Sequence, residues 1–166
     1  MVYYDSQQSL TETLTEYILT ADANERCIVV TQAITIKQLV RNPEIRTRLQ
    51  AGDLHFFSAE AMLEDICDAS GRLSDQRFIA KIGGLIASIE QSGKKVRVYG
   101  DMVVLLWKSG ARSKAIALEE LWNKLSQVQS FSLLCAYPEQ SIVQKNARLH
   151  IDTCHAQTFS LAAAST

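Results

Sequence analysis

The sequence predicts a single α/β domain in which helices cover both faces of a mainly parallel sheet, as a three-layer α/β/α sandwich. From Cys27 onward, short and uniformly apolar runs alternate with segments of helical periodicity, a pattern typical of parallel strands joined by helical crossovers. A length of 166 residues suits one domain with a sizeable core. No repeat, low-complexity tract or linker divides the chain.

The first helix is expected to begin at Ser9, because Ser9 and Glu12 have the spacing of a capping box. The apolar residues that follow share one helical face; they are Leu10, Leu14, Tyr17 and Ile18. The apolar run Cys27–Thr31 then predicts a strand buried on both sides.

Two further helix starts are expected before the second strand. Thr35 and Gln38 have the spacing of another capping box. Pro43, after Asn42, suits the first turn of the next helix, and Gly52 is placed to end it.

Leu54–Ser58 is predicted to be the second strand, followed by a helix that Gly71 interrupts. Ser74 is expected to cap a longer helix with apolar residues at helical spacing. Gly83 and Gly84 stand in its middle, where each costs about 1 kcal/mol relative to alanine. That cost predicts either the close approach of another backbone or a weakness that the helix tolerates.

Lys95–Tyr99 is the third predicted strand, and Asp101 separates it from a short apolar helix that ends at Gly110. The next helix has a clear apolar stripe, formed by Leu118, Leu121, Trp122 and Leu125. Phe131–Pro138 is the fourth predicted strand. A last helix is expected to begin near Ser141. The domain is expected to span 1–158, with 159–166 as a loose tail.

Composition excludes several classes of protein. The net charge of −1 gives no global attraction to nucleic acid or to an anionic membrane. The longest apolar run, Met102 to Trp107, is far too short to span a bilayer. The N-terminus has neither the basic start nor the apolar core of a secretory signal. The four cysteines form no CxxC pair, so we expect reduced thiols in a cytoplasmic protein.

The sequence contains no motif typical of a nucleotide-binding or metal-binding site. Neither GxxxxGK[ST] nor GxGxxG occurs, and no glycine lies between Arg26 and Gly52 to form a phosphate-binding turn after the first predicted strand. His150 and Cys154 stand four residues apart, but no second pair of ligands completes a metal site. We therefore expect no cofactor and no metal.

Asp101 is the residue of most interest, and two interpretations stay open. It can cap the helix that follows by accepting hydrogen bonds from its first amides. It also lies at the carboxyl end of a predicted central strand, where α/β proteins bind their ligands. Trp107 and Trp122 are expected on the neighbouring helices and Tyr137 at the end of the next strand, although each aromatic also suits a core. Asn123 is polar in a packed helix and needs a partner.

The segment VRVYGDMVVLLWKSGARSKAIALEELWNKLSQVQSFSLLCAYP resembles the MEDS (methanogen/methylotroph sensory) family, whose members carry a pattern close to vRvyGEMV-LLW--G---AA--LEeLWN-L-----FsLlCaYp. YYDSQQSL, ERCIVVTQ, FFSAEAMLEDI and SDQRFIAKIGGLI are similar to the family in looser form. The family usually has Glu where Asp101 stands. Its histidine before the first aromatic pair has no counterpart here.

The resemblance implies a relative of the RecA/KaiC-type ATPases that has lost its phosphate loop. Such domains sense small molecules, among them hydrocarbon derivatives, and occur beside histidine kinase or DNA-binding modules. No kinase or DNA-binding segment is recognised after Pro138, so the output is expected to pass through a partner or through self-association.

We therefore expect a non-catalytic sensory domain of bacterial two-component signalling. A small organic ligand would bind near Gln32, Tyr99, Asp101, Trp107 and Tyr137. The expected partners are a histidine kinase or regulator, or a second copy in a homodimer, but neither nucleic acid nor membrane. The alternative is a pure interaction module that docks through a sheet edge or through the LEELWN helix, which carries Glu119, Trp122 and Asn123. A vestigial nucleotide-binding enzyme ranks third.

Overall fold

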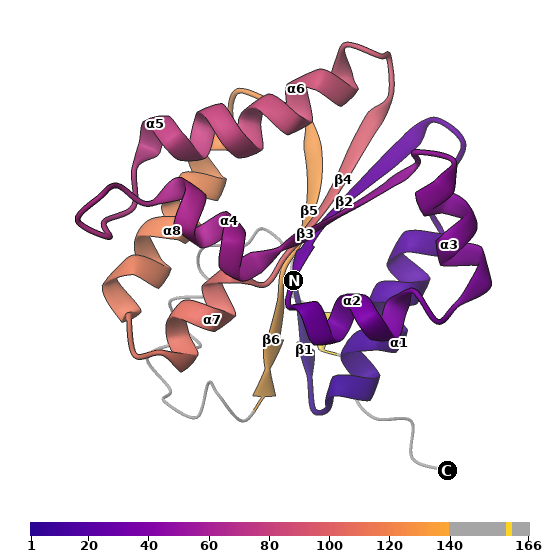
Figure 1. The fold of residues 1–166 in the computed structure, drawn as a ribbon, viewed down its shortest axis with the longest axis horizontal. Coiled ribbons are helices and arrows are strands. Elements are labelled where there is room, and N and C mark those ends of the chain that lie inside the picture. Colours follow the sequence, from indigo (N-terminus) through magenta and orange to yellow (C-terminus); the bar gives the residue numbers. More distant parts are fainter. Residues whose placement is uncertain (140–158, 161–166) are drawn as a thin grey trace.

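Helices lie on both sides of a layer of strands in the computed structural model of the protein (Figure 1), which describes residues 1–139 and 159–160. One side holds α1 (Gln7–Leu19), α2 (Ala33–Leu39) and α3 (Pro43–Gln50). The opposite side holds α4 (Ala59–Ile66), α5 (Asp75–Phe78), α6 (Gly84–Glu90), α7 (Met102–Lys108) and α8 (Arg112–Ser126), with the π-helical turn η1 (Ile79–Gly83) between α5 and α6. The three-layer α/β/α sandwich is confirmed.

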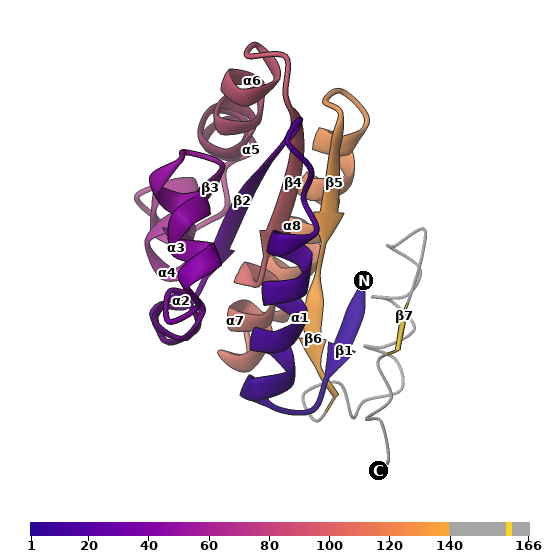
Figure 2. The same ribbon diagram turned by 90° about the vertical axis from the view of Figure 1, so that its right-hand side faces the viewer.

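All pairings between the named strands are parallel, in two sheets. The four-stranded sheet has the order β3-β2-β4-β5 and consists of β2 (Glu25–Thr31), β3 (Leu54–Ser58), β4 (Lys95–Gly100) and β5 (Phe131–Leu134). The three-stranded sheet has the order β6-β1-β7 and consists of β1 (Val2–Tyr4), β6 (Ala136–Pro138) and β7 (Phe159–Ser160). Figure 2 shows the two sheets side by side.

The order of the four-stranded sheet places a topological switch point between β2 and β4. From β2 the chain crosses to β3 on one side and then returns to β4 on the other side. The helical connections therefore diverge between these two strands, and their carboxyl ends border the crevice in which α/β proteins bind ligands. Thr31 ends β2 there, and Asp101 directly follows β4.

The prediction of one strand over Phe131–Pro138 is wrong, because the run divides at Cys135. The first part pairs with β4 and the second with β1. The carbonyl of Cys135 accepts a hydrogen bond from the amide of Val2 at 2.9 Å, which ties the break to the start of the chain. The apolar character of the run cannot reveal the change of partner, although β5 is only half-buried and β6 is largely buried.

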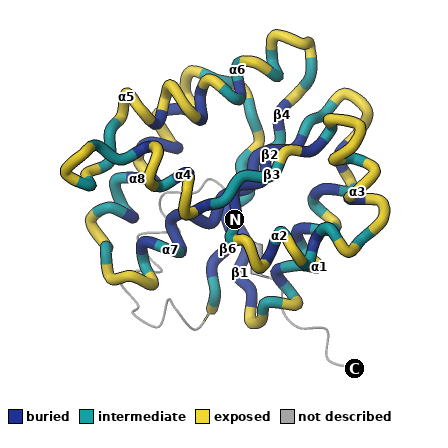
Figure 3. The backbone as a smooth tube through the Cα atoms, viewed as in Figure 1, coloured by how far each residue is buried: buried dark blue, intermediate teal, exposed yellow. Residues whose placement is uncertain are grey.

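Strand residues alternate between two apolar cores, one on each face of the sheets. The core beneath α1, α2 and α3 includes Tyr4, Val29 and Tyr99. The core on the opposite face includes Tyr3, Val30 and Val98, with Phe78 and Trp122 from the helices. Figure 3 shows the same division, with buried residues on the strands and on the inner sides of the helices and exposed residues outside.

Two helix starts differ from those expected. α1 begins one turn earlier than Ser9: the Ser6 hydroxyl accepts from the Ser9 amide at 3.1 Å, and the Ser6 amide donates to the Ser9 hydroxyl at 3.2 Å. This capping box forms without the Glu12 that the spacing suggested. α2 begins after Gln32, whose side chain caps nothing, so Thr35 lies inside the helix rather than at its cap.

Other predicted boundaries are confirmed. Asn42 caps α3 through its side-chain oxygen, with Pro43 in the first turn. Gly52 follows the helix with φ of +74°, the left-handed conformation that favours glycine at this position. Ser58 and Ser74 cap α4 and α5.

Gly83 is closely approached by side chains and not, as expected, by another backbone. A Cβ on Gly83 would lie 3.3 Å from Leu125 Cδ1, and Gln129 Nε2 donates to the Gly83 carbonyl at 3.0 Å. Gly84 has nothing within 4 Å of the same position. Only Gly83, in the π-helical turn, therefore has a packing reason to lack a side chain.

Two residues of the expected loose tail, Phe159 and Ser160, form β7 and pair with Val2 and Tyr3. The helix expected near Ser141 lies outside the described residues, as do the remaining positions of that tail. None of the helices in the described part of the chain has the length and apolar character needed to cross a membrane.

Candidate functional site

Asp101 and Thr31 join the carboxyl ends of β4 and β2 at the switch point. The Thr31 hydroxyl donates to Asp101 Oδ2 at 2.6 Å, and both residues are buried. Asp101 occupies the N-cap position of α7, but its side chain makes no capping hydrogen bond. The capping interpretation of the carboxylate is therefore wrong, because the side chain turns to the neighbouring strand instead of to the helix amides.

Burial raises the pKa of Asp101 from 3.8 to about 6. The hydrogen bond from Thr31 and the backbone amide of Gln32 act in the opposite direction, as does the more distant charge of Lys108, whereas Glu60 adds to the rise. No group reaches hydrogen-bond geometry at the second carboxylate oxygen, Oδ1, which is buried. A buried carboxylate with one oxygen unpartnered is costly.

Tyr99 and Tyr4 lie on the same side of the sheet as Asp101. Tyr4 and Tyr99 belong to the core beneath α1. Asp101 accepts from Thr31, which strand alternation places on the same face of β2 as Val29 of that core. The Tyr99 hydroxyl is buried and, within residues 1–139, has no hydrogen-bond partner. Burial, with Asp101 as the second cause, raises the pKa of Tyr4 to about 12. The pKa of Tyr99 is raised well above its usual 10 by the same two causes, burial first. These three residues and Thr31 form what we call the Asp101 cluster.

Trp107 and Tyr137, expected beside Asp101, belong to the core on the opposite face. The Tyr137 hydroxyl donates a short hydrogen bond to the buried Glu119. The indole Nε1 of Trp107 is buried and has no partner among the described residues. The five expected site residues thus lie on two sides of the strand layer. Gln32, Tyr99 and Asp101 lie together on one side, and Trp107 and Tyr137 lie on the other.

The three residues of the LEELWN helix have different environments. Trp122 is buried, with its ring edge-on to Phe78 at 5.2 Å between centroids. Glu119 is also buried, which leaves Asn123 as the exposed member. The expectation that Asn123 is packed and needs a partner is wrong. Helix periodicity places it on the outer side, one residue past Trp122.

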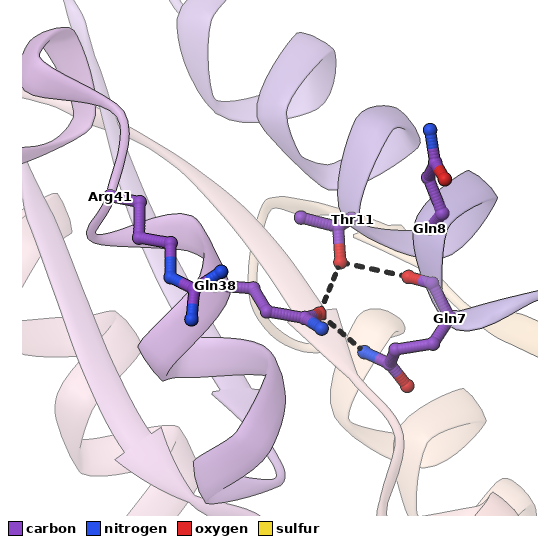
Figure 4. Close-up of a pocket in the computed structure, with 5 residues that line it drawn as sticks. All are labelled: Gln7, Gln8, Thr11, Gln38 and Arg41. Atoms are coloured by element: carbon purple, nitrogen blue, oxygen red, sulfur yellow. Dashed lines mark hydrogen bonds between the residues drawn. The ribbon is translucent and has the colours of Figure 1, made fainter.

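An open groove lies between the first two turns of α1 and the end of α2 (Figure 4). Its volume is about 450 Å³ and it is lined by Gln7, Gln8, Thr11, Gln38 and Arg41. Gln7 Nε2 and the Thr11 hydroxyl both donate to Gln38 Oε1, at 3.1 and 2.8 Å, so the groove floor is a closed hydrogen-bond network. This network also reaches the buried Thr35, which accepts from Gln7 at 3.0 Å.

Sequence reasoning missed Thr31, Tyr4 and the groove. Thr31 was recognised as a strand end, and the parallel register that places it beside Asp101 was the missing information. The strand that carries Tyr4 has only three residues and stands at the very start of the chain, where a strand pattern is too short to recognise. No group of three or more potential metal-ligating side chains gathers in the described ranges; His150 and Cys154 lie outside them.

Comparison with known proteins gives one match. A family model described as "MEthanogen/methylotroph, DcmR Sensory domain" matches residues 1–155 of the 166-residue chain. No curated protein and no solved structure matches the chain significantly.

Proposed function

Because the chain belongs to the MEDS family of sensory domains, we propose that it is a non-catalytic receiver of a chemical signal. It binds a small organic ligand beside Asp101 and passes the event to a signalling partner, such as a histidine kinase or regulator, or to a second copy of itself. The single observation that carries this proposal is the Asp101 cluster. A costly, incompletely satisfied carboxylate lies where this architecture binds ligands.

The strand-to-helix junctions support a RecA/KaiC-like scaffold that has no phosphate loop. A P-loop needs a glycine-rich turn between a strand and a helix. The β1–α1 junction is Asp5 and Ser6, the β2–α2 junction is Gln32, and the β4–α7 junction is Asp101, while β3 runs directly into α4. These four junctions have no glycine, so a triphosphate would find no such turn at any of them.

The position of Asp101 offers a route for the output. Asp101 directly precedes α7, and α7 packs against both α8 and α4. A ligand that binds more tightly to one placement of Asp101 shifts the population toward the matching placement of these helices. The free thiols of Cys27, Cys67 and Cys135 support a reducing, cytosolic setting for this signalling.

A screen of small organic compounds by thermal unfolding, followed by titration calorimetry, tests the proposal. We expect at least one compound class to raise the unfolding temperature in a saturable way, because a ligand that binds only the folded state stabilises it by mass action. Asp101→Asn should lose the effect. Glu120→Gln, the same change at an exposed carboxylate of α8, should retain it. A screen without any Asp101-dependent compound contradicts the proposal.

The alternative, an interaction module, is favoured by one observation. Among the described strands, β3 pairs only with β2 and is the edge strand of the four-stranded sheet, where free backbone groups can pair with another chain. The LEELWN helix is a weaker candidate for a docking surface, since its exposed residues are polar. Sedimentation of the chain with a purified histidine kinase separates the two functions. A charged substitution at the exposed His55 of β3 should block docking through the sheet edge, whereas Asp101→Asn should leave this docking unchanged.

A further inference from the structure

The Asp101 cluster contains two polar atoms that need a partner. Asp101 Oδ1 and the Tyr99 hydroxyl are both buried and, in the part of the chain that the structure describes, neither makes a hydrogen bond. The side chains are 1% and 0% exposed respectively. Such atoms are rare in native proteins and each calls for an explanation, such as an absent ligand or water. Tyr99 lies near the carboxyl end of β4 and Asp101 directly follows that strand, close enough for its charge to act on the Tyr99 hydroxyl, so one small molecule can serve both.

The cluster also needs positive charge. Asp101 takes part in none of the ion pairs among the described residues; Lys108 influences it only from a distance, and the influence of Glu60 has the opposite sign. Buried carboxylates are normally paired with a cation, because the attraction must offset the loss of hydration. The helix amides do not take this role, since the carboxylate does not cap α7.

The chemistry of the missing partner follows from these two needs. Asp101 Oδ1 accepts hydrogen bonds, and the hydroxyl oxygens of Tyr99 and Tyr4 can also accept. An alkylammonium group supplies positive charge together with N–H donors, and its alkyl part suits the aromatic walls, which also attract cations. A neutral alcohol would satisfy the hydrogen bonds but not the charge. A quaternary ammonium would supply the charge without a donor.

We propose that the Asp101 cluster is a binding site for a small protonated primary or secondary amine, with Asp101 as its counter-ion and the hydroxyls of Tyr99 and Tyr4 as further acceptors. The inference rests on the proposed function and gives the ligand a chemical class. Tyr4 is 9% exposed, the most of the three residues.

The test uses the full chain at neutral pH, where alkylamines are protonated as lysine is. Thermal unfolding and calorimetry are recorded with methyl-, ethyl- and butylammonium chloride. The matched additives are sodium chloride, tetramethylammonium chloride and ethanol at the same concentrations. We expect a saturable rise in the unfolding temperature with at least one primary amine and with none of the matched additives.

Variants locate the site. Asp101→Asn should weaken amine binding at least tenfold, and Tyr99→Phe should weaken it several-fold. Tyr17→Phe is the matched control: the Tyr17 hydroxyl already donates to the Val98 carbonyl at 3.2 Å, so its loss should leave amine binding unchanged. Circular dichroism and the unfolding temperature without amine show whether each variant is folded.

The outcomes separate the two proposals. If no primary amine binds, or if the response survives both Asp101→Asn and Tyr99→Phe, the amine inference is wrong. If amines fail while a neutral compound binds and needs Asp101, the proposed sensory function stands without it. If neither amines nor neutral compounds bind, both proposals fall.

Discussion

At the scale of the residue, the burial of Asp101 makes stability depend on pH. Its pKa is raised from 3.8 to about 6 by burial, so the folded state holds this proton more tightly than the unfolded state. The stabilisation is fully present below the lower value and is lost as pH rises through the higher one. A shift of about two pKa units corresponds to roughly 3 kcal/mol.

Asp101→Asn therefore tests the electrostatics of the ligand-free protein. The wild type should lose about 3 kcal/mol of unfolding free energy, relative to Asp101→Asn, as pH rises from about 4 to about 7. The measurement is urea unfolding at several pH values. Glu60, Lys108, Tyr4 and Tyr99 face the same group and are unchanged in both proteins. A difference that stays constant with pH would show that the carboxyl does not titrate in this range.

Thr31→Val should lower stability by about 2 kcal/mol near pH 7, because a hydrogen bond to a charged acceptor is removed and a second carboxylate oxygen loses its partner. The loss should be smaller below about pH 5, where the carboxyl is protonated in the folded state. Thr31→Ser keeps the hydroxyl and should restore most of the stability. If Thr31→Ser lost as much stability as Thr31→Val, the hydroxyl would not be the source of the stabilisation, since Ser keeps the hydroxyl and Val keeps the methyl group.

Among the candidate site residues, the sequence predicted Asp101, Gln32 and Tyr99 near neighbouring strand ends, because strand ends can be recognised from apolar patterns. It could not separate Trp107 and Tyr137 from them. Which face of a sheet a side chain occupies depends on the register and on the exact strand bounds, and a shift of one residue exchanges the faces. Tyr137 stands two residues after the break at Cys135, which the pattern did not show.

At the scale of the element, the two adjacent glycines at the junction of η1 and α6 should respond differently to alanine. Gly84→Ala should raise the unfolding free energy by up to about 1 kcal/mol, since the space is empty and alanine favours a helix. Gly83→Ala should gain less or lose stability, because the new methyl meets Leu125 at 3.3 Å. Chemical unfolding of the two variants gives the comparison directly; equal gains would contradict the packing around η1.

The elements themselves were largely predictable, and their ends were not. Leu54–Ser58 has the bounds that the apolar run indicated, because Gly52 precedes it and Ser58 caps the next helix. The capping boxes at Ser9 and Thr35 were misplaced, since a hydroxyl caps a helix only where the backbone is extended. Ser6 and Gln32 have that conformation, which their residue types do not reveal.

At the scale of the whole molecule, the strand order predicts the pattern of amide hydrogen exchange. β2 and β4 each have strands on both sides, whereas β3 has one neighbour within residues 1–139 and 159–160. Amides of β2 and β4 should exchange slowest, and those of β3 that face away from β2 should exchange orders of magnitude faster. Mass spectrometry of peptides from the exchanged protein checks this. Uniform protection of β3 would indicate that another chain covers the edge.

The layered architecture followed from the alternation of strands and helices, but the second sheet did not. β1 and β6 have three residues each. The local sequence does not indicate that β1 pairs with β6 and with β7. Such contacts join the two ends of the chain and are decided by the packing of Tyr3 and Tyr137, whose rings lie 6.2 Å apart.

The break at Cys135 has a mechanical consequence. A single chain segment belongs to both sheets, and the bond from Val2 pins it at the crossing point. A sliding motion of one sheet along the other would therefore break the backbone hydrogen bonds between this segment and β1 or β4. A conformational change in this molecule is therefore expected to move the helices over the sheets rather than one sheet relative to the other.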